Sequence, residues 1–85
     1  MDREIAGAFT FIYDHHHREL LNKIIDIQHD FQNIVKSSQH IHLDHYNCLE
    51  IVAVKGNSST VMNLTNSLKA LKGVKHGSLS VSSTG

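Results

Sequence analysis

The segment QHIHLDHYNCLEIVAVK, residues 39–55, decides how the 85-residue chain folds. Polar and apolar residues alternate on both sides of its centre, which is the pattern of two half-buried strands. The polar run His45-Tyr46-Asn47 separates the two alternating stretches and suits a tight turn. We therefore expect a β-hairpin with strands over residues 39–44 and 48–55.

The length of the turn decides which side chains share a face of this hairpin. With an odd number of turn residues, for example three, Asp44 lies opposite Cys48. The Cys48 thiol then shares a face with His40 and His42, whereas an even number turns it away. The same odd register gathers the apolar residues on the other face, which we expect the helices to cover: Ile41, Leu43, Leu49, Ile51 and Ala53.

Two helices and two further strands are expected outside the hairpin. Alternation over residues 5–13 predicts a strand, and apolar residues spaced by three and four predict an amphipathic helix over residues 18–36. After a break at residues 56–59, a second helical stripe ends at Gly73, and residues 74–82 form the last strand.

The order βαββαβ predicts a ferredoxin-like sandwich, an α+β fold with an antiparallel sheet and both helices on one face, because each crossover places its helix on the same side. Asp14 is the expected N-cap of the first helix. No linker divides the chain, so residues 1–85 form a single domain.

The first strand carries apolar residues on both faces, with Phe9 and Phe11 on one side and Ala8 and Ile12 on the other. The second face of a two-layer sandwich is normally polar. We therefore expect a homo-oligomer that buries the helix-free face of the sheet.

The composition excludes several classes of protein. Eight Lys and Arg balance eight Asp and Glu, so nothing favours direct binding of nucleic acid. No apolar run approaches the ~20 residues of a membrane-spanning helix. The single Cys forms no internal disulfide and fits a reducing compartment. We expect a cytoplasmic protein whose unusual feature is its eight His.

The hairpin carries residues that can bind a metal ion. His40 and His42 are two apart on a strand, so both imidazoles can reach one ion, with Cys48 as a third donor. Zinc, copper and nickel usually take four ligands in such sites. His29 faces away from its own core and would supply the fourth ligand only across a subunit interface. The residues alone leave open a polar strand edge and a solvated helix His.

Four stretches, residues 13–16, 26–29, 39–50 and 73–77, resemble the C-terminal domain of the NikR-type nickel-responsive transcriptional regulators. The resemblance covers almost all of the chain and includes Cys48-Leu49-Glu50 after the turn. It implies a domain of ACT type, with the ferredoxin-like topology, that assembles four subunits.

The resemblance also implies a nickel site. It assigns one planar, four-coordinate Ni(II) per chain to His40, His42 and Cys48 of one subunit and His29 of another. Planar coordination by imidazole and thiolate favours Ni(II) or Cu(II), whereas Zn(II) prefers a tetrahedron. Because the thiol must ionise and each imidazole must be neutral, binding is expected to weaken as pH falls.

Other polar residues receive smaller roles. Glu50 and Asp44 are expected to accept hydrogen bonds from the free ring N–H groups of the ligands. His15-His16-His17 are interpreted as solvated capping residues, with an auxiliary weak metal site as the alternative. We expect His45 to be exposed in the turn and His76 to be structural.

The sequence departs from the family in one respect. Family members carry an N-terminal ribbon-helix-helix segment that binds DNA, whereas this sequence enters its first strand within a few residues of Met1. We expect that segment to be absent, so that DNA is bound only through a separate N-terminal domain. Both an excised domain and a natural stand-alone protein fit the sequence.

Two other functions also fit the residues. Cys48 could act as a nucleophile with a nearby His as base. No oxyanion hole or substrate pocket is recognisable, so we expect a regulatory domain and not an enzyme. The alternative is an ACT-like module that binds a small metabolite, with incidental His residues. Binding of an amino acid without metal would favour that module.

Overall fold

The computed structural model describes residues 3–83, so both ends of the domain expected over residues 1–85 lie outside the described residues. Within that range the elements follow the order βαββαβ, as predicted. They are β1 (Glu4–Asp14), α1 (Arg18–Asp30), β2 (Val35–His42), β3 (Asn47–Asn57), α2 (Ser58–Lys69) and β4 (Lys75–Ser83).

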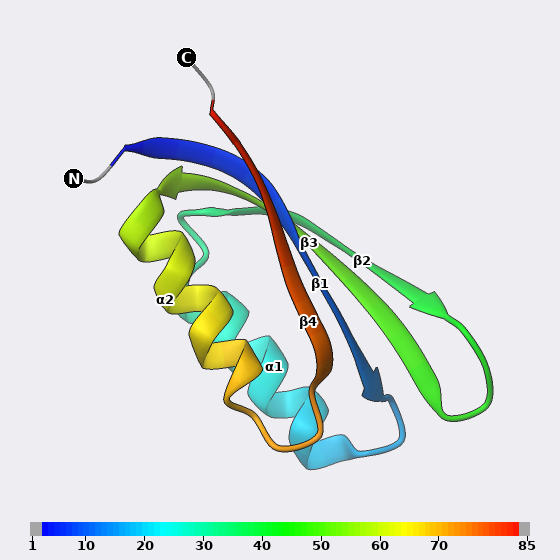
Figure 1. Cartoon of the computed structure of the whole chain (residues 1–85). Helices are drawn as coiled ribbons and strands as arrows, with labels where there is room; N and C mark the ends of the chain where they lie inside the picture. Colours follow the sequence, from blue (N-terminus) through cyan, green and yellow to red (C-terminus); the bar gives the residue numbers. More distant parts are fainter. Residues whose placement is uncertain (1–2, 84–85) are drawn as a thin grey trace.

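The strands form one sheet in the order β2-β3-β1-β4. All of its neighbouring strands are antiparallel. Both helices cover the same face of the sheet (Figure 1). This arrangement confirms the ferredoxin-like sandwich, and it puts the two central strands, β3 and β1, beneath the helices.

The core lies between the helices and the helix-side face of β1 and β3. The side chains of Phe9, Phe11 and Tyr13 follow one another along β1 and stack with ring centroids 5.3 and 5.6 Å apart. Burying such rings stabilises the fold more than any other single contribution from β1. The helices contribute five buried members, which are Leu20, Ile24, Val61, Leu64 and Leu68. The other buried members come from the strands and the segment before β2, and they are Ile5, Ile34, Cys48, Val52 and Val54.

The first helix is shorter than predicted. It ends at Asp30 and not at residue 36, and β2 begins at Val35. The apolar residues at the end of the expected helix belong instead to the sheet side of the molecule, because the carbonyl of Ile34 accepts a hydrogen bond of 2.9 Å from the Lys55 N–H. Pairing with β3 satisfies this carbonyl, which would have been one of the last four unpaired carbonyls of a helix that reached residue 36.

The N-cap of α1 is His17, and the prediction of Asp14 was wrong. The Nδ1 atom of His17 accepts a hydrogen bond of 3.0 Å from the Leu20 N–H. The Asp14 carboxylate instead accepts a hydrogen bond of 2.9 Å from the His16 N–H and shapes the turn before the helix. Asp14 lies three residues too early because the chain makes this turn before the helix begins.

The strands of the hairpin pair two positions away from the predicted register. His42, and not Asp44, lies opposite Cys48, while His40 lies opposite Glu50. The number of residues between His42 and Cys48 is still odd. The prediction that Cys48 shares a face with His40 and His42 is therefore confirmed.

Asp44 belongs to the turn. Its Oδ1 atom accepts hydrogen bonds of 2.9 Å from the backbone N–H groups of Tyr46 and Asn47. An Asp side chain that bonds the backbone two residues ahead stabilises a turn and competes with strand pairing. This competition explains why the strand β2 ends at His42 and not at Asp44.

The assignment of faces was wrong. Phe11 and Tyr13 face the helices, and pairing of β1 with β3 sets Glu50 and Cys48 directly opposite them. The candidate ligands therefore lie on the helix-side face. The aromatic rings of β1 decide this, because they bury more apolar area than the small residues on its other face. Among the apolar residues expected under the helices, Ile41, Leu49, Ile51 and Ala53 lie on the helix-free face and Leu43 lies in the turn.

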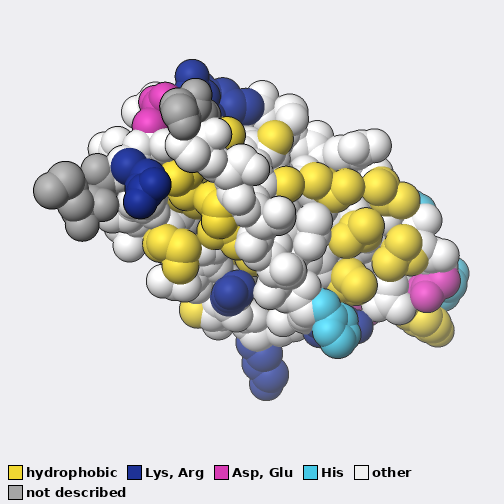
Figure 2. All heavy atoms as spheres, turned by 45° about the horizontal axis from the view of Figure 1, so that its top comes forward, with side chains coloured by type: hydrophobic (Ala, Val, Ile, Leu, Met, Phe, Trp, Pro, Cys, Tyr) yellow, Lys and Arg dark blue, Asp and Glu magenta, His cyan; other side chains and the backbone are white. Residues whose placement is uncertain are grey.

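The helix-free face keeps an apolar character, as expected from β1. Figure 2 shows hydrophobic side chains gathered over the sheet toward the hairpin end of the molecule. Ile12 of β1 pairs with Leu49 of β3, and Ala8 pairs with Ala53, all of them half-buried. An apolar sheet face without a helix layer is unusual for a monomeric sandwich.

Gly7 allows β4 to approach β1 closely. A Cβ atom at this position would overlap the backbone oxygen of Ser80. We expect Gly7→Ala to lower the free energy of unfolding by about 1 to 3 kcal/mol, because a strand backbone cannot move aside as a side chain can. Thermal or urea unfolding measures this change.

Gly77→Ala is the matched control. A Cβ atom there would lie 3.0 Å from Lys69 Cγ and from Phe9 Cζ, which are side-chain atoms. Rotation of these side chains should make this substitution milder than Gly7→Ala. Equal losses for the two variants would show that the contact with Ser80 does not limit the approach of β4.

Candidate metal centre

The β2–β3 hairpin brings three of the four predicted ligands to one face. His42 lies opposite Cys48, and His40 lies two residues before His42 on the same strand, β2. The hairpin extends beyond the helices (Figure 1), so its end is not covered by them. The His40 side chain is 47% exposed because it lies on the edge strand β2, whereas Glu50, opposite it on the central strand β3, is buried.

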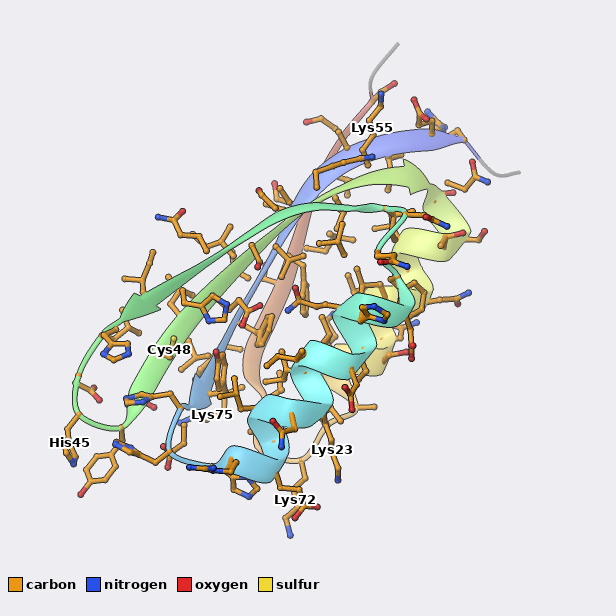
Figure 3. The ribbon with its side chains drawn as sticks, turned by 180° about the vertical axis from the view of Figure 1, so that it is seen from behind. Lys23, His45, Cys48, Lys55, Lys72 and Lys75 are labelled. Carbon is orange, nitrogen blue, oxygen red and sulfur yellow. The ribbon has the colours of Figure 1, made fainter. Side chains whose placement is uncertain are left out.

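Cys48 lies deeper than the two imidazoles. It is 2% exposed and has no disulfide partner. Figure 3 shows it on β3 just beyond the turn that carries His45. Its thiol faces the side chain of Tyr13, which is its pairing partner on β1. A thiol held at a fixed place beside two exposed imidazoles is a suitable anchor for a soft or borderline metal ion.

The ring of His40 is held by two oxygen atoms. Its Nδ1 atom lies 3.1 Å from the Tyr13 hydroxyl and 3.5 Å from Oε1 of Glu50. Among the described residues, the other ring nitrogen, Nε2, has no such contact. Glu50 thus lies where an acceptor for the ring N–H of a ligand was expected. Asp44 does not, because its carboxylate is engaged in the turn.

Glu50 is completely buried and joins several elements. Its Oε1 atom accepts a hydrogen bond of 3.1 Å from the Tyr13 hydroxyl, and its Oε2 atom accepts one from the side-chain amide of Gln28 on α1. Burial, followed by the charge of Glu50, raises the pKa of Tyr13 above its usual range. The Tyr13 hydroxyl therefore keeps its hydrogen and acts as a hydrogen-bond donor at neutral pH.

Sequence reasoning did not single out Tyr13 or Gln28 as parts of this site. Tyr13 belongs to the alternating residues that predict the first strand, and Gln28 directly precedes the candidate ligand His29. Both lie within the stretches that carry the family resemblance. The pairing of Tyr13 with Cys48 was not predictable without the β1–β3 register.

His42 contacts a group of imidazoles at the end of the hairpin. Its ring stacks on His15 at a centroid distance of 4.4 Å, and His15 lies 4.2 Å from His16. His16 in turn lies 5.1 Å from the exposed His45. Of the three residues expected to cap the helix, only His17 does so. The alternative of an auxiliary metal site for them stays a prediction.

His29 lies apart from the hairpin ligands in its own chain. It is exposed near the end of α1, whereas its neighbour Gln28 turns inward to Glu50. The ligands were expected on the sheet face that the helices do not cover, and this was wrong, since α1 and the ligands are on the same side of the sheet. The outward direction of His29 has another cause, the ~100° rotation between successive residues of a helix.

His76 lies on β4 and is exposed. Its backbone φ of 55° falls in the left-handed region, where few residues other than glycine are found. His76 lies where the pairing of β1 with β4 is irregular, between Lys75 and Ser78. Its place is consistent with a structural role, because it is distant in the sheet order from β2.

The four candidate ligands have the chemistry that a borderline metal ion prefers, but a single chain does not bring them together. Across residues 3–83 no three His, Cys, Asp or Glu side chains lie close enough together to hold a metal ion. The thiol of Cys48 and the imidazoles of His40 and His42 are nevertheless the ligand types that Ni(II), Cu(II) and Zn(II) prefer. Within the same residues, no helix is long and apolar enough to cross a membrane.

The fold is shared with solved structures of low sequence identity. It superposes on the ACT domain of a GTP pyrophosphokinase from Chlorobium tepidum with a TM-score of 0.71 and 12% sequence identity, over 92% of this chain and 100% of that one. An uncharacterised protein from Thermotoga maritima matches with a TM-score of 0.82 and 11% identity, over 93% and 98% of the two chains. The protein therefore has an ACT-type fold.

Within this class the chain belongs to the family of NikR C terminal nickel binding domains, which residues 6–82 match. Two relatives carry the name "Putative nickel-responsive regulator". The one from Syntrophus aciditrophicus is 71% identical over 99% of this chain and 61% of its own length. The one from Chlorobaculum parvum is 58% identical over 93% and 59%. The chain thus spans about three fifths of these relatives, which are named as regulators and not as enzymes.

The turn between β1 and α1 depends on an ionised Asp14. The hydrogen bond from the His16 N–H holds the pKa of Asp14 below its usual range, and the charge of the His16 ring adds a smaller effect. The contribution of this carboxylate to stability is therefore present above the pKa of the unfolded chain and is lost as pH falls through the lower, folded value. NMR titration of the Asp14 carboxyl carbon should show this low pKa.

His16→Ala tests the cause. It keeps the backbone N–H and removes the ring, so most of the lowering of the Asp14 pKa should persist. Return of the Asp14 pKa to its usual range in His16→Ala would show that the imidazole, and not the backbone, is the main cause.

Proposed function

We propose that this chain is the nickel-sensing and tetramerising part of a transcriptional regulator. One Ni(II) per chain is bound at a subunit interface by His40, His42 and Cys48 of one subunit and His29 of another. The observation that carries the proposal is the position of these four side chains. Three share the helix-side face of a projecting hairpin, where the Cys48 thiol is buried and His40 and His42 are exposed, and the fourth is exposed on a helix.

The chemistry of the four donors supports nickel. Bound Ni(II) would link two subunits through three imidazoles and one thiolate, a set that planar d-metal ions accept. Affinity alone favours copper, so selectivity has to come from a planar arrangement and from the metal available in the cell. A free thiol ligand fits the reducing cytoplasm, where we place the protein.

The surface around His29 supports donation to a neighbouring subunit. Ile25 lies one helical turn before His29, on the same side of α1, and is 53% exposed. On the hairpin, Leu43 and Tyr46 are 50% and 62% exposed. Large apolar side chains beside each half of the site are typical of surfaces that come together in an assembly.

The helix-free sheet face supports the tetramer. A nickel site shared by two chains requires one interface between them. Joining two such pairs into a tetramer requires a second interface. The half-buried apolar residues of β1 and β3 offer that second surface, and closed symmetric assemblies use the same patch on both partners. Nickel that binds only the assembled state would stabilise it by mass action.

DNA binding is not proposed for these residues. Their formal net charge is zero, which provides no excess of cations for phosphates. The regulators that the chain matches are longer, and we assign contact with DNA to a separate domain of such a protein. The chain would report nickel to that domain through the geometry of the assembly.

A subunit-mixing experiment tests the shared site. His29→Ala and His42→Ala should each lose high-affinity nickel binding, because every site in either homo-oligomer lacks one ligand. After the two variants exchange subunits, a hairpin from His29→Ala can meet His29 of the other variant. We expect part of the nickel binding to return, measured by titration and by native mass spectrometry.

Two controls complete this test. Mixing His40→Ala with His42→Ala should restore nothing, since both changes affect the same hairpin. Unchanged affinity in His29→Ala alone would contradict the shared site. Binding of an amino acid by the metal-free chain, with no uptake of nickel, would favour the metabolite-binding module instead.

The second interface is tested by a charge on the helix-free face. Ile51 lies in the middle of β3 on that face, and Ile51→Glu should shift the assembly to smaller species because a buried carboxylate is strongly unfavourable. Asn63→Glu adds the same charge to an exposed position of α2 and should leave the mass unchanged. Size-exclusion chromatography with light scattering measures both, and an unchanged mass for Ile51→Glu would contradict this interface.

A further inference from the structure

Among the residues that the structure describes, Glu50 is the only acidic or basic residue that is buried, and it is 0% exposed. Burying a carboxylate is costly unless hydrogen bonds and an opposite charge compensate for it. Its contacts are the Tyr13 hydroxyl, the Gln28 amide and the half-exposed ring of His40. None of them carries a permanent positive charge, so the cost needs an explanation.

The hydrogen atoms around Glu50 determine the state of the His40 ring. The Tyr13 hydroxyl has one hydrogen, which it donates to Oε1 of Glu50 at 3.1 Å. If it donated to His40 instead, two acceptor oxygen atoms would face each other at that distance. The 3.1 Å contact between Tyr13 and His40 Nδ1 is therefore a hydrogen bond only when Nδ1 carries the proton.

We propose that Glu50 is a positioning residue of the nickel site, which rests on the proposed function. Through Tyr13 and by its own proximity it keeps the proton of neutral His40 on Nδ1, so that the lone pair of Nε2 is the metal donor. Its buried negative charge also favours a divalent cation at the end of the hairpin. The metal thereby supplies the compensating charge that the fold lacks.

The same carboxylate also joins the two halves of the site. Gln28 donates to Glu50 and directly precedes His29 in α1. This hydrogen bond fixes the rotation of α1 about its axis near the helix end, and so directs His29 outward. Glu50 therefore sets a ligand ring in its own hairpin and the direction of the ligand that the chain gives to a neighbour.

Glu50→Gln separates this role from a structural one. The new side chain has the same shape and can keep its hydrogen bonds if the Gln28 amide turns over. We expect nickel affinity to fall about 10- to 100-fold, as for other residues that orient metal ligands. The thermal midpoint of the metal-free chain should not fall, because a buried charge is removed.

Glu19→Gln is the matched control. It removes an exposed carboxylate from α1, where Glu19 pairs with Lys23, and it should change neither nickel affinity nor the thermal midpoint. A purely structural Glu50 would give the opposite pattern, with a lower midpoint and an unchanged affinity. That result would overturn the proposal.

The tautomer of His40 provides a readout that needs no metal. In the metal-free wild type, ¹⁵N NMR should show His40 protonated on Nδ1 when it is neutral, and Glu50→Gln or Tyr13→Phe should shift it toward protonation on Nε2. Tyr13→Phe keeps the ring and the charge of Glu50, so it serves if Glu50→Gln does not fold. Neutral wild-type His40 protonated mainly on Nε2 would overturn the proposal.

The two proposals fail in different ways. If the wild type does not bind nickel, the proposed function fails, while the tautomer measurement still tests the role of Glu50. If the wild type binds nickel and Glu50→Gln binds it equally well, only the role of Glu50 fails.

Discussion

The pairing of β3 with β1 is the constraint on which the rest of the structure depends. It sets Cys48 opposite Tyr13 and Glu50 opposite Phe11. Because the aromatic side chains of β1 must be buried under the helices, this pairing turns the thiol and the carboxylate to the same side. Pairing of β2 with β3 then carries His40 and His42 to that side as well. Core packing and the placement of the proposed metal ligands are thus consequences of one strand register.

A conflict between burial and access is resolved across the hairpin, between its two strands. The central strand β3 holds the buried Glu50 and Cys48. Directly opposite Glu50, on the edge strand β2, the imidazole of His40 is half exposed. The thiol is thereby fixed in the core while the imidazole stays open to solvent. The ACT-type fold alone would not define such a site, since the same fold occurs in chains with only 12% sequence identity.

The errors of sequence reasoning have a common cause. Periodicity showed that Ile41 and Ile51 share a face and that Cys48 belongs to the other, but it could not say which face the helices cover. Periodicity also extended the first helix to residue 36, whereas the carbonyl of Ile34 bonds to Lys55. In both cases a partner distant in the sequence decided the outcome. Glu50 was expected beside a ligand, yet its contact with Gln28 required the packing of α1 on the sheet.

The sequence by itself determined the order of the elements, the ferredoxin-like topology, the common face of His40, His42 and Cys48, and the family. The first three follow from alternation and helical period, which are local or nearly local in the chain. The family follows from the resemblance of residues 13–16, 26–29, 39–50 and 73–77. Only the tertiary structure decided that this face is the helix side, that Tyr13 and Glu50 contact His40, and that Gln28 joins Glu50 to α1. Those outcomes depend on which apolar surfaces are buried together, and that choice is made by the whole chain at once.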